Sequence, residues 1–145
     1  MVKRVLFLCT GNACRSQMAE GWARHLHAAD IEAYSAGVKP HGLDSRAVKV
    51  MQEAGVDISQ HRSNHVDELL SIDFDVVITV CDAAAETCPV FPRQVPMLHY
   101  GFPDPPSLAE DSKTEADALL HYRRVRDEIR AFIETLPDNT LLSTT

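Results

Sequence analysis

The residues best suited to chemistry lie in one stretch near the N-terminus, from Cys9 to Arg15 (C-T-G-N-A-C-R). The apolar run V-L-F-L precedes this stretch and an amphipathic segment follows it, which predicts a strand, a loop and a helix. A cysteine in a loop that leads into a helix lies near the positive end of the helix dipole, where the thiolate is favoured over the thiol. Cys9 is therefore the candidate nucleophile.

The residues after Cys9 can form a cradle for a tetrahedral oxyanion. Gly11 can adopt a positive φ and Asn12 tolerates one, so successive backbone N–H groups can point inward as an anion-binding nest. Arg15 offers a planar fork of donors to two anion oxygens, and the Ser16 hydroxyl can donate to the Cys9 thiolate. The alternative, a buried apolar cysteine and a surface arginine, is disfavoured by the surrounding glycine, strand and helix. The predicted oxyanion-binding residues are Thr10, Gly11, Asn12, Ala13, Cys14 and Arg15.

Two further cysteines lie much later in the chain. Cys81 ends a β-branched run, and Cys88 follows in D-A-A-A-E-T-C-P. A helix over residues 81–88 would separate their Cα atoms by about 10 Å, whereas a disulfide needs roughly 4.4–6.8 Å. The pair can therefore bond only where that segment is not helical. A redox pair and a core role for Cys81 both stay open, while the spacing disfavours a zinc site.

Asp104 lies in the proline-rich stretch G-F-P-D-P-P, which predicts a stiff loop. An aspartate of this kind is often an ordinary turn residue. Opposite a nucleophile, however, its carboxyl group can protonate a leaving oxygen as a general acid. We expect the seven histidines and Glu20 to lie at the surface in solvent.

The composition indicates one domain over residues 1–145, with residues 137–145 as a loose tail. The net charge of −7 and the absence of a basic run disfavour nucleic acid and anionic membranes as partners. The first apolar run is too short for a signal peptide or a membrane span. We therefore expect a cytoplasmic protein, in which four cysteines indicate catalysis, redox chemistry or metal binding rather than structural disulfides.

Strands and helices alternate along the sequence. Apolar runs predict strands over residues 3–8, 31–35, 74–80 and 95–99. Helical spacing predicts helices over residues 16–27 and 44–54, a short turn over 67–71, and a long last helix with Ser112 and Glu115 as its capping box. This alternation predicts a single-domain α/β fold, an open four-stranded parallel sheet with helices on both faces. The carboxyl ends of the strands, where such sheets bind ligands, would bring together Cys9, Cys81 and the loop of Asp104.

Four stretches together resemble the low-molecular-weight protein tyrosine phosphatase fold across nearly the whole chain. They are C-T-G-N-A-C-R-S, Ser35-Ala36-Gly37, the segment G-V-D-I-S-Q-H-R-S from Gly55 to Ser63, and Asp104-Pro105. Within that fold, Cys81 and Cys88 in T-V-C-D-A-A-A-E-T-C-P-V-F-P resemble the thioredoxin-coupled arsenate reductases. Phosphatases of the fold tend to place aromatic residues after their Asp-Pro, where this sequence has Pro106 and Ser107, and this disfavours phosphotyrosine.

The resemblance implies reduction of arsenate to arsenite without a tightly bound cofactor. Cys9 would attack the arsenic atom, Arg15 would hold the oxyanion, and Asp104 would protonate the departing hydroxide. Cys81 would next attack the sulfur of Cys9 and release arsenite. Cys88 would then attack Cys81, leaving a Cys81–Cys88 disulfide for thioredoxin to reduce. We expect the protein to act as a monomer.

Some reductases of this kind bind a monovalent cation through residues that match Asn12, Glu20 and Ser35, together with an acidic residue where this sequence has Asn64. The neutral Asn64 leaves that set one acidic ligand short.

Two other functions stay open. A phosphatase would use the same loop, because phosphate and arsenate are near isosteres, and would need neither Cys81 nor Cys88. A non-enzymatic thiol module would bind arsenite or a soft metal through the four cysteines, but it would leave Arg15 and Asp104 without a role.

Overall fold

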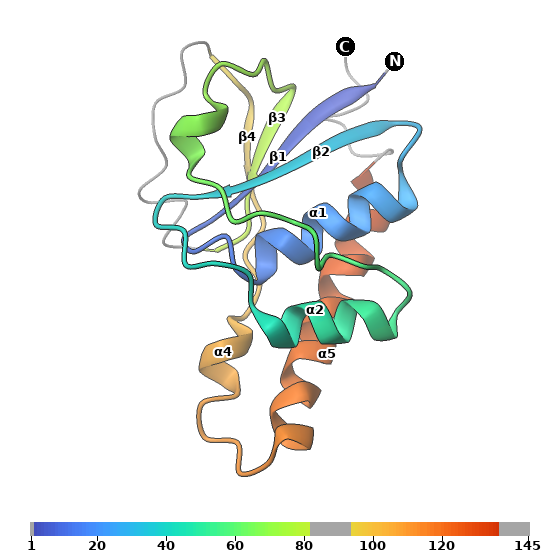
Figure 1. The fold of residues 1–145 in the computed structure, drawn as a ribbon. Coiled ribbons are helices and arrows are strands. Elements are labelled where there is room, and N and C mark those ends of the chain that lie inside the picture. Colours follow the sequence, from blue (N-terminus) through green and yellow to red (C-terminus); the bar gives the residue numbers. More distant parts are fainter. Residues whose placement is uncertain (1, 82–93, 137–145) are drawn as a thin grey trace.

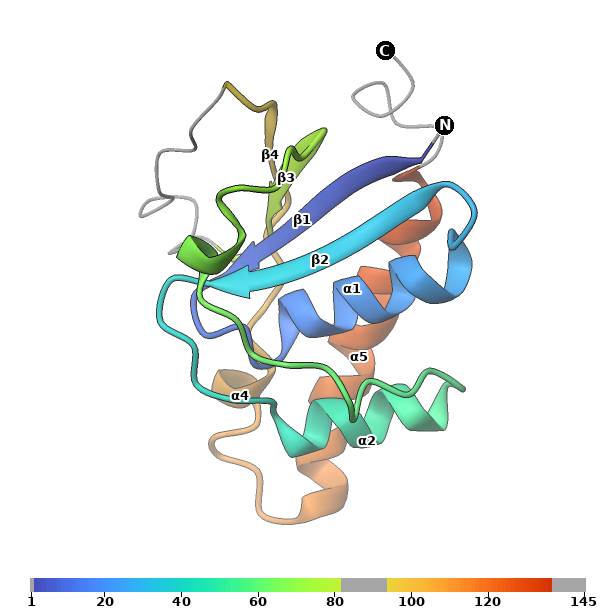
Figure 2. The same ribbon diagram turned by 45° about the horizontal axis from the view of Figure 1, so that its top comes forward.

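A four-stranded parallel sheet forms the centre of the computed structural model, which describes residues 2–81 and 94–136. The strand order is β2-β1-β3-β4. The strands are β1 (Lys3–Cys9), β2 (Ile31–Gly37), β3 (Val76–Thr79) and β4 (Met97–His99). Residues 5–8 of β1 and all of β3 are buried, as expected for apolar strands in the middle of a parallel sheet. The arrowheads of β1 and β2 point to the same edge, so the loop after β1 begins there (Figure 2).

Three long helices cover one side of the sheet: α1 (Arg15–Leu26), α2 (Ser45–Glu53) and α5 (Glu115–Glu134). The 3-10 helix η1 (Val66–Leu69) lies on the other side of β2 (Figures 1 and 2). Trp22 of α1 is buried and donates from Nε1 to the backbone oxygen of Arg126 in α5 at 3.1 Å. This packing fixes α1 between the sheet and α5, with its first turn behind the loop that follows β1. No helix among the described residues is long and apolar enough to cross a membrane.

The predicted α/β fold with a four-stranded parallel sheet is confirmed. Helices were predicted on both faces; among the described residues, α1, α2 and α5 lie on one face and the short η1 lies on the other. The predicted strands and helices are present with shifted ends; β2, for instance, continues to Gly37, while β3 is limited to Val76–Thr79. The predicted turn near residue 67 is the helix η1. Residues 82–93, which include Cys88, and residues 137–145, the expected tail, lie outside the described residues.

Two local predictions are wrong. The capping box at Ser112 and Glu115 is not formed, because α5 begins at Glu115 and its N-cap is Thr114, whose hydroxyl accepts from the backbone N–H of Asp117 at 3.1 Å. The proline-rich stretch is not all loop, because α4 (Pro105–Leu108) begins directly after Asp104. Proline at the first helical position costs no hydrogen bond, since that N–H has no partner within a helix.

Candidate active site

The loop between β1 and α1 turns its carbonyl groups outward. The carbonyl oxygens of four successive residues accept hydrogen bonds from groups around the loop: Thr10 from Lys39 N (2.9 Å), Gly11 from His41 N (2.9 Å), Asn12 from Gln17 Nε2 (3.0 Å) and Ala13 from Asp44 N (2.9 Å). In a trans peptide the C=O of one residue and the N–H of the next point in opposite directions, so these N–H groups point inward. The loop therefore has the polarity of an anion-binding nest.

The side chain of Asn12 stabilises the loop through its hydrogen bonds. It is fully buried and has a φ of 47°, which confirms the predicted left-handed conformation. Its Nδ2 donates to Ser16 Oγ at 2.8 Å, and its Oδ1 accepts from Gln17 Nε2 at 3.1 Å and from the backbone N–H of Asn64 at 2.8 Å. Because Ser16 Oγ accepts this bond, its own hydrogen can be donated elsewhere. The expected bond from Ser16 to the Cys9 thiolate stays a prediction.

Two glycines allow neighbouring parts of the protein to pack closely against the loop. The prediction of a positive φ at Gly11 is wrong, because among the described glycines only Gly42 and Gly55 have one. A Cβ atom on Gly11 would instead come within 2.6 Å of the His41 ring. At Gly37, where β2 ends, a Cβ atom would lie 2.6 Å from the Thr10 carbonyl oxygen and 2.9 Å from Asn12 N. Glycine at position 37 therefore lets β2 pack directly against the loop.

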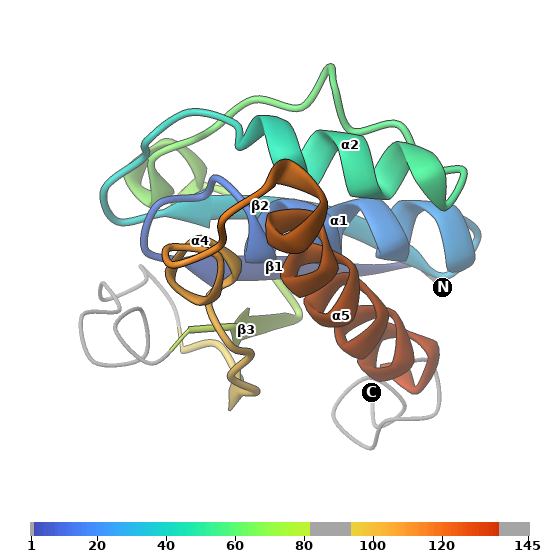
Figure 3. The same ribbon diagram turned by 90° about the horizontal axis from the view of Figure 1, so that it is seen from below.

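Arg15 and Asp104 meet across the mouth of the loop. Arg15 Nη2 lies 3.4 Å from Asp104 Oδ1, and Arg15 Nη1 donates to the backbone oxygen of Phe102 at 3.0 Å. Asp104 is 39% exposed and accepts from Ser107 Oγ at 2.8 Å. Figure 3 shows α4, which follows Asp104, beside the loop. A cavity of about 400 Å³ opens here, lined by Cys9, Thr10, Gly11, Ala13, Cys14, Arg15, His41, Asp104 and Pro106.

The thiols of Cys9 and Cys81 lie together beneath this cavity. Cys81, 3% exposed, receives the Thr10 backbone N–H at 3.2 Å, and its sulfur lies 3.3 Å from Thr10 Oγ1. The pKa of Cys9 lies well above its ordinary value, first because the thiol hydrogen-bonds to Cys81 and second because it is buried. Arg15 and the Gly11 N–H lower the pKa of Cys9, but their effect is smaller. The raised pKa opposes the expected preference for a Cys9 thiolate in the ligand-free protein.

Cys14 is a third free cysteine and is also buried. Burial, followed by the nearby Asp44 carboxylate, raises the pKa of its thiol well above the ordinary value. Among residues 2–81 and 94–136, no group of three or more His, Cys, Asp or Glu side chains is arranged to hold a metal ion.

The expectation that Glu20 and all histidines lie in solvent is wrong. Glu20 is 6% exposed, accepts from Ser35 Oγ at 2.5 Å and forms an ion pair with Arg24 at 2.8 Å. His61 Nε2 lies 3.8 Å from Glu20, and its Nδ1 lies 3.0 Å from Gln17 Oε1. Burial lowers the pKa of His61, against the effect of Glu20. The helical spacing could have indicated that these side chains lie together, because positions 17, 20 and 24 fall on one face of α1.

The structure brings several of the candidate residues together, and their assignment to a functional site stays a prediction. Cys9, Cys81, Arg15 and Asp104 come together at the carboxyl ends of the strands, as expected. Their chemical roles stay predictions, as does the role of Cys88. The cavity wall formed by His41 was missed, because His41 reaches the loop through a backbone contact that no motif indicates.

Comparison with known proteins identifies relatives along nearly the whole chain. The family model described as low molecular weight phosphotyrosine protein phosphatase matches residues 4–141. Over 137 residues, the chain is 47% identical to an arsenate reductase of Bacillus licheniformis and 45% identical to one of Bacillus subtilis. Each alignment covers 92% of this chain and 96% of the relative.

Solved structures give the same result. An arsenate reductase in the phosphate binding state superposes with a TM-score of 0.77 at 32% identity, over 93% of this chain and 96% of that chain. A low molecular weight protein tyrosine phosphatase from T. tengcongensis superposes with a TM-score of 0.68 at 29% identity, over 94% and 98% of the two chains. The resemblance inferred from the sequence motifs is confirmed, and the chain belongs to the low-molecular-weight phosphotyrosine protein phosphatase family.

Proposed function

We propose that this protein reduces arsenate to arsenite, with Cys9 as the first nucleophile and Cys81 as the second. The observation that carries the proposal is the contact of the Cys81 thiol with both Cys9 and Thr10, directly behind the oxyanion loop. Hydrolysis of a phosphate ester needs only one cysteine in such a loop. A second buried thiol within reach of the first is what a reduction requires. The relatives named arsenate reductase support the same choice.

In the first step, a basic oxygen of the bound arsenate dianion takes the proton of Cys9, and the resulting thiolate attacks the arsenic atom. A sulfur–arsenic bond forms while an arsenic–hydroxyl bond breaks. Asp104 acts as the general acid that donates a proton to the departing hydroxide, which leaves as water. Arg15, which contacts Asp104 in the ligand-free protein, turns its donors to the oxyanion, together with the inward N–H groups of the loop.

In the second step, the Cys81 thiolate attacks the sulfur of Cys9. The sulfur–sulfur bond forms, the sulfur–arsenic bond breaks, and arsenic keeps the electron pair, so As(V) becomes As(III) and leaves as arsenite. The Thr10 N–H donates to the Cys81 sulfur, and the Thr10 hydroxyl lies within hydrogen-bond distance of it, so Thr10 holds this sulfur in position. The protein is then oxidised by two electrons and must be reduced before another turnover.

In the third step, the Cys88 thiolate attacks the sulfur of Cys81, the Cys9–Cys81 bond breaks and Cys9 leaves as a thiolate. The resulting Cys81–Cys88 disulfide is then reduced by an external dithiol. Cys88 lies outside the described residues, so this step rests on the sequence motif and on the relatives. We propose thioredoxin as the reductant. A cytoplasmic location and a monomeric state belong to the same proposal.

Coupled turnover tests the proposal. Arsenate should support NADPH oxidation in the presence of thioredoxin and thioredoxin reductase, and Cys9→Ser should abolish it. Cys81→Ser should also abolish turnover but should leave binding of inorganic phosphate nearly unchanged, because the loop that holds the anion is intact. Normal arsenate turnover by Cys81→Ser would exclude the second step as written.

Phosphatase activity is the alternative that the same geometry allows, because the loop and Asp104 can also cleave a phosphomonoester with water as the second nucleophile. Hydrolysis of an aryl phosphate should then survive the loss of both Cys81 and Cys88. The ratio of kcat/KM for arsenate to kcat/KM for the aryl phosphate distinguishes the two functions. A ratio below one for the wild-type protein would favour the phosphatase.

A further inference from the structure

Asn12 and Glu20, two of the side chains that would form a cation site beneath the loop, already use their oxygens within the protein. Asn12 Oδ1 accepts two hydrogen bonds, from Gln17 Nε2 and from the backbone N–H of Asn64. The two carboxylate oxygens of Glu20 are both engaged, Oε1 by the Ser35 hydroxyl and Oε2 by the Arg24 guanidinium. A cation bound to oxygen ligands needs several of them to point inward together. The residues present therefore do not fit a monovalent cation.

Charge leads to the same conclusion. Glu20 is the one formally charged member of the set Asn12, Glu20, Ser35 and Asn64, and Arg24 neutralises it at 2.8 Å. The site therefore has no net negative charge that would attract a monovalent cation.

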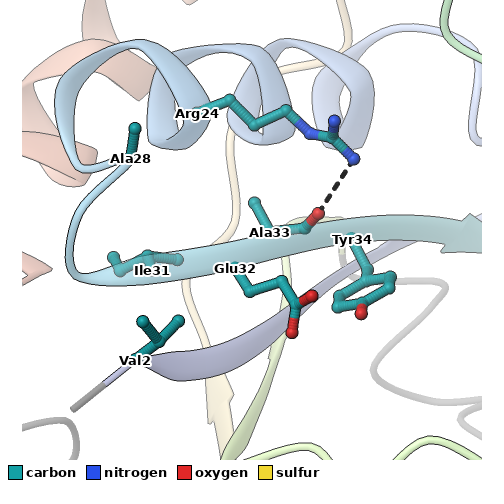
Figure 4. A pocket seen from close by; sticks show the side chains of 7 residues that line it. All are labelled: Val2, Arg24, Ala28, Ile31, Glu32, Ala33 and Tyr34. Atoms are coloured by element: carbon teal, nitrogen blue, oxygen red, sulfur yellow. Dashed lines mark hydrogen bonds between the residues drawn. The ribbon is translucent and has the colours of Figure 1, made fainter.

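Arg24 is held in this position by the fold. Its Nη2 donates to the carbonyl oxygen of Ala33 at 3.2 Å as well as to Glu20, so it bridges α1 and the edge strand β2. Figure 4 shows the bond between Arg24 and Ala33. Both residues also line an open cavity of about 560 Å³ along β2. The Arg24 side chain is 57% exposed, whereas that of Glu20 is 8% exposed, so the guanidinium closes the site from the solvent side.

The Glu20 carboxylate is linked to the oxyanion loop by a continuous series of hydrogen bonds. Ser35 donates to Glu20 at 2.5 Å, and its backbone oxygen accepts from Asn64 Nδ2 at 3.4 Å. The backbone N–H of Asn64 donates to Asn12 Oδ1 at 2.8 Å. Asn12 is the residue whose left-handed conformation shapes the loop. Neutralisation of Glu20 thus supports the geometry of the anion site.

We propose that Arg24 supplies, from within the chain, the positive charge that a monovalent cation would otherwise supply at Glu20, so that the oxyanion loop is ordered independently of K⁺. Arg24 acts here as a positioning residue for the loop. The inference concerns anion binding and stability, so it holds whether the bound oxyanion is reduced or hydrolysed.

Thermal unfolding and phosphate binding test this proposal without any turnover. The Tm of the wild-type protein and its Kd for inorganic phosphate should be the same in KCl, NaCl and tetramethylammonium chloride of equal ionic strength. Arg24→Gln should lower the Tm by roughly 5 °C, because it removes the guanidinium that pairs with a buried carboxylate. Its lost stability and phosphate affinity should be partly restored by KCl and not by tetramethylammonium chloride. Arg24→Lys should behave like the wild type.

Arg124→Gln is the matched control. It removes another i,i+4 ion pair, Arg124–Glu128, at an exposed position on α5, and should show neither the loss nor the K⁺ response. Stabilisation of the wild-type protein by K⁺ over tetramethylammonium would overturn the proposal, and so would an Arg24→Gln variant that responds to all three salts alike. The wild-type measurement decides the matter even where Arg24→Gln does not fold.

Discussion

Thr10 is the residue that connects the oxyanion loop to the second thiol, because its N–H and hydroxyl group both contact Cys81 Sγ. Thr10→Val removes the hydroxyl and keeps the shape and the N–H. We expect release of arsenite in a single turnover to slow by about 10- to 100-fold, since a hydrogen bond to a charged group contributes roughly 1.5–3 kcal/mol.

Phosphate affinity is the control for this variant. It should change little in Thr10→Val, because the loop amides are retained, and Thr10→Ser should restore the rate of arsenite release. Equal rates for Thr10→Val and the wild type would show that the hydroxyl does not assist Cys81.

The thiol pair should set the pH dependence of alkylation of Cys9. Only the thiolate reacts, and the pKa of Cys9 is raised, so the rate should rise with pH along a curve whose midpoint lies above the ordinary thiol value of about 8.5. Cys81→Ala removes the largest cause of the shift and should move the midpoint to lower pH. Iodoacetamide labelling of the phosphate-free protein, read at the Cys9 peptide by mass spectrometry, measures both curves. A midpoint that stays in place in Cys81→Ala would contradict the pairing.

At the scale of elements, the end of β2 supports the loop through its close approach at Gly37. Gly37→Ala introduces a Cβ atom against backbone atoms of Thr10 and Asn12, which cannot move without distorting the loop. We expect a loss of stability of about 1–3 kcal/mol and weaker binding of phosphate.

Gly11→Ala is the informative comparison, because its Cβ atom meets the ring of His41, an exposed side chain that can rotate away. It should therefore cost less stability than Gly37→Ala. Urea unfolding of both variants measures the two losses of stability. A larger loss for Gly11→Ala than for Gly37→Ala would show that the end of β2 does not stabilise the loop.

The elements also show how far the sequence could predict the site. Cys9, Asn12 and Arg15 were predictable because their roles depend on neighbours within a few residues, where strand, loop and helix follow one another. The supports of the loop carbonyls come from residues 39–44 and 17, and nothing in a local pattern indicates those pairings.

Long-range contacts also explain the wrong predictions. A glutamate in the first helix is usually solvated, and only the packing of α1 against β2 and the segment before η1 buries Glu20. The effect of Cys81 on the pKa of Cys9 was missed for the same reason, since Cys81 follows β3 and lies 71 residues along the sequence from Thr10, which it contacts.

At the scale of the whole molecule, the parallel sheet brings the candidate site residues together. Cys9 is the last residue of β1, Cys81 lies just after β3, and Asp104 lies in the segment after β4. These residues lie close together because neighbouring parallel strands end at the same edge of the sheet. The cavity at this edge holds one permanent cation among its described lining residues, Arg15, in a chain of net charge −7. Anion binding therefore depends on the local loop and not on the overall field of the protein.

The most direct test of the proposed reduction is to treat the fully reduced protein with one equivalent of arsenate, in the absence of other thiols, and to map disulfides by mass spectrometry. The wild-type protein should carry a Cys81–Cys88 disulfide in step with the arsenite released, and Cys88→Ser should accumulate a Cys9–Cys81 disulfide. Release of arsenite without any disulfide that contains Cys81 would contradict the account.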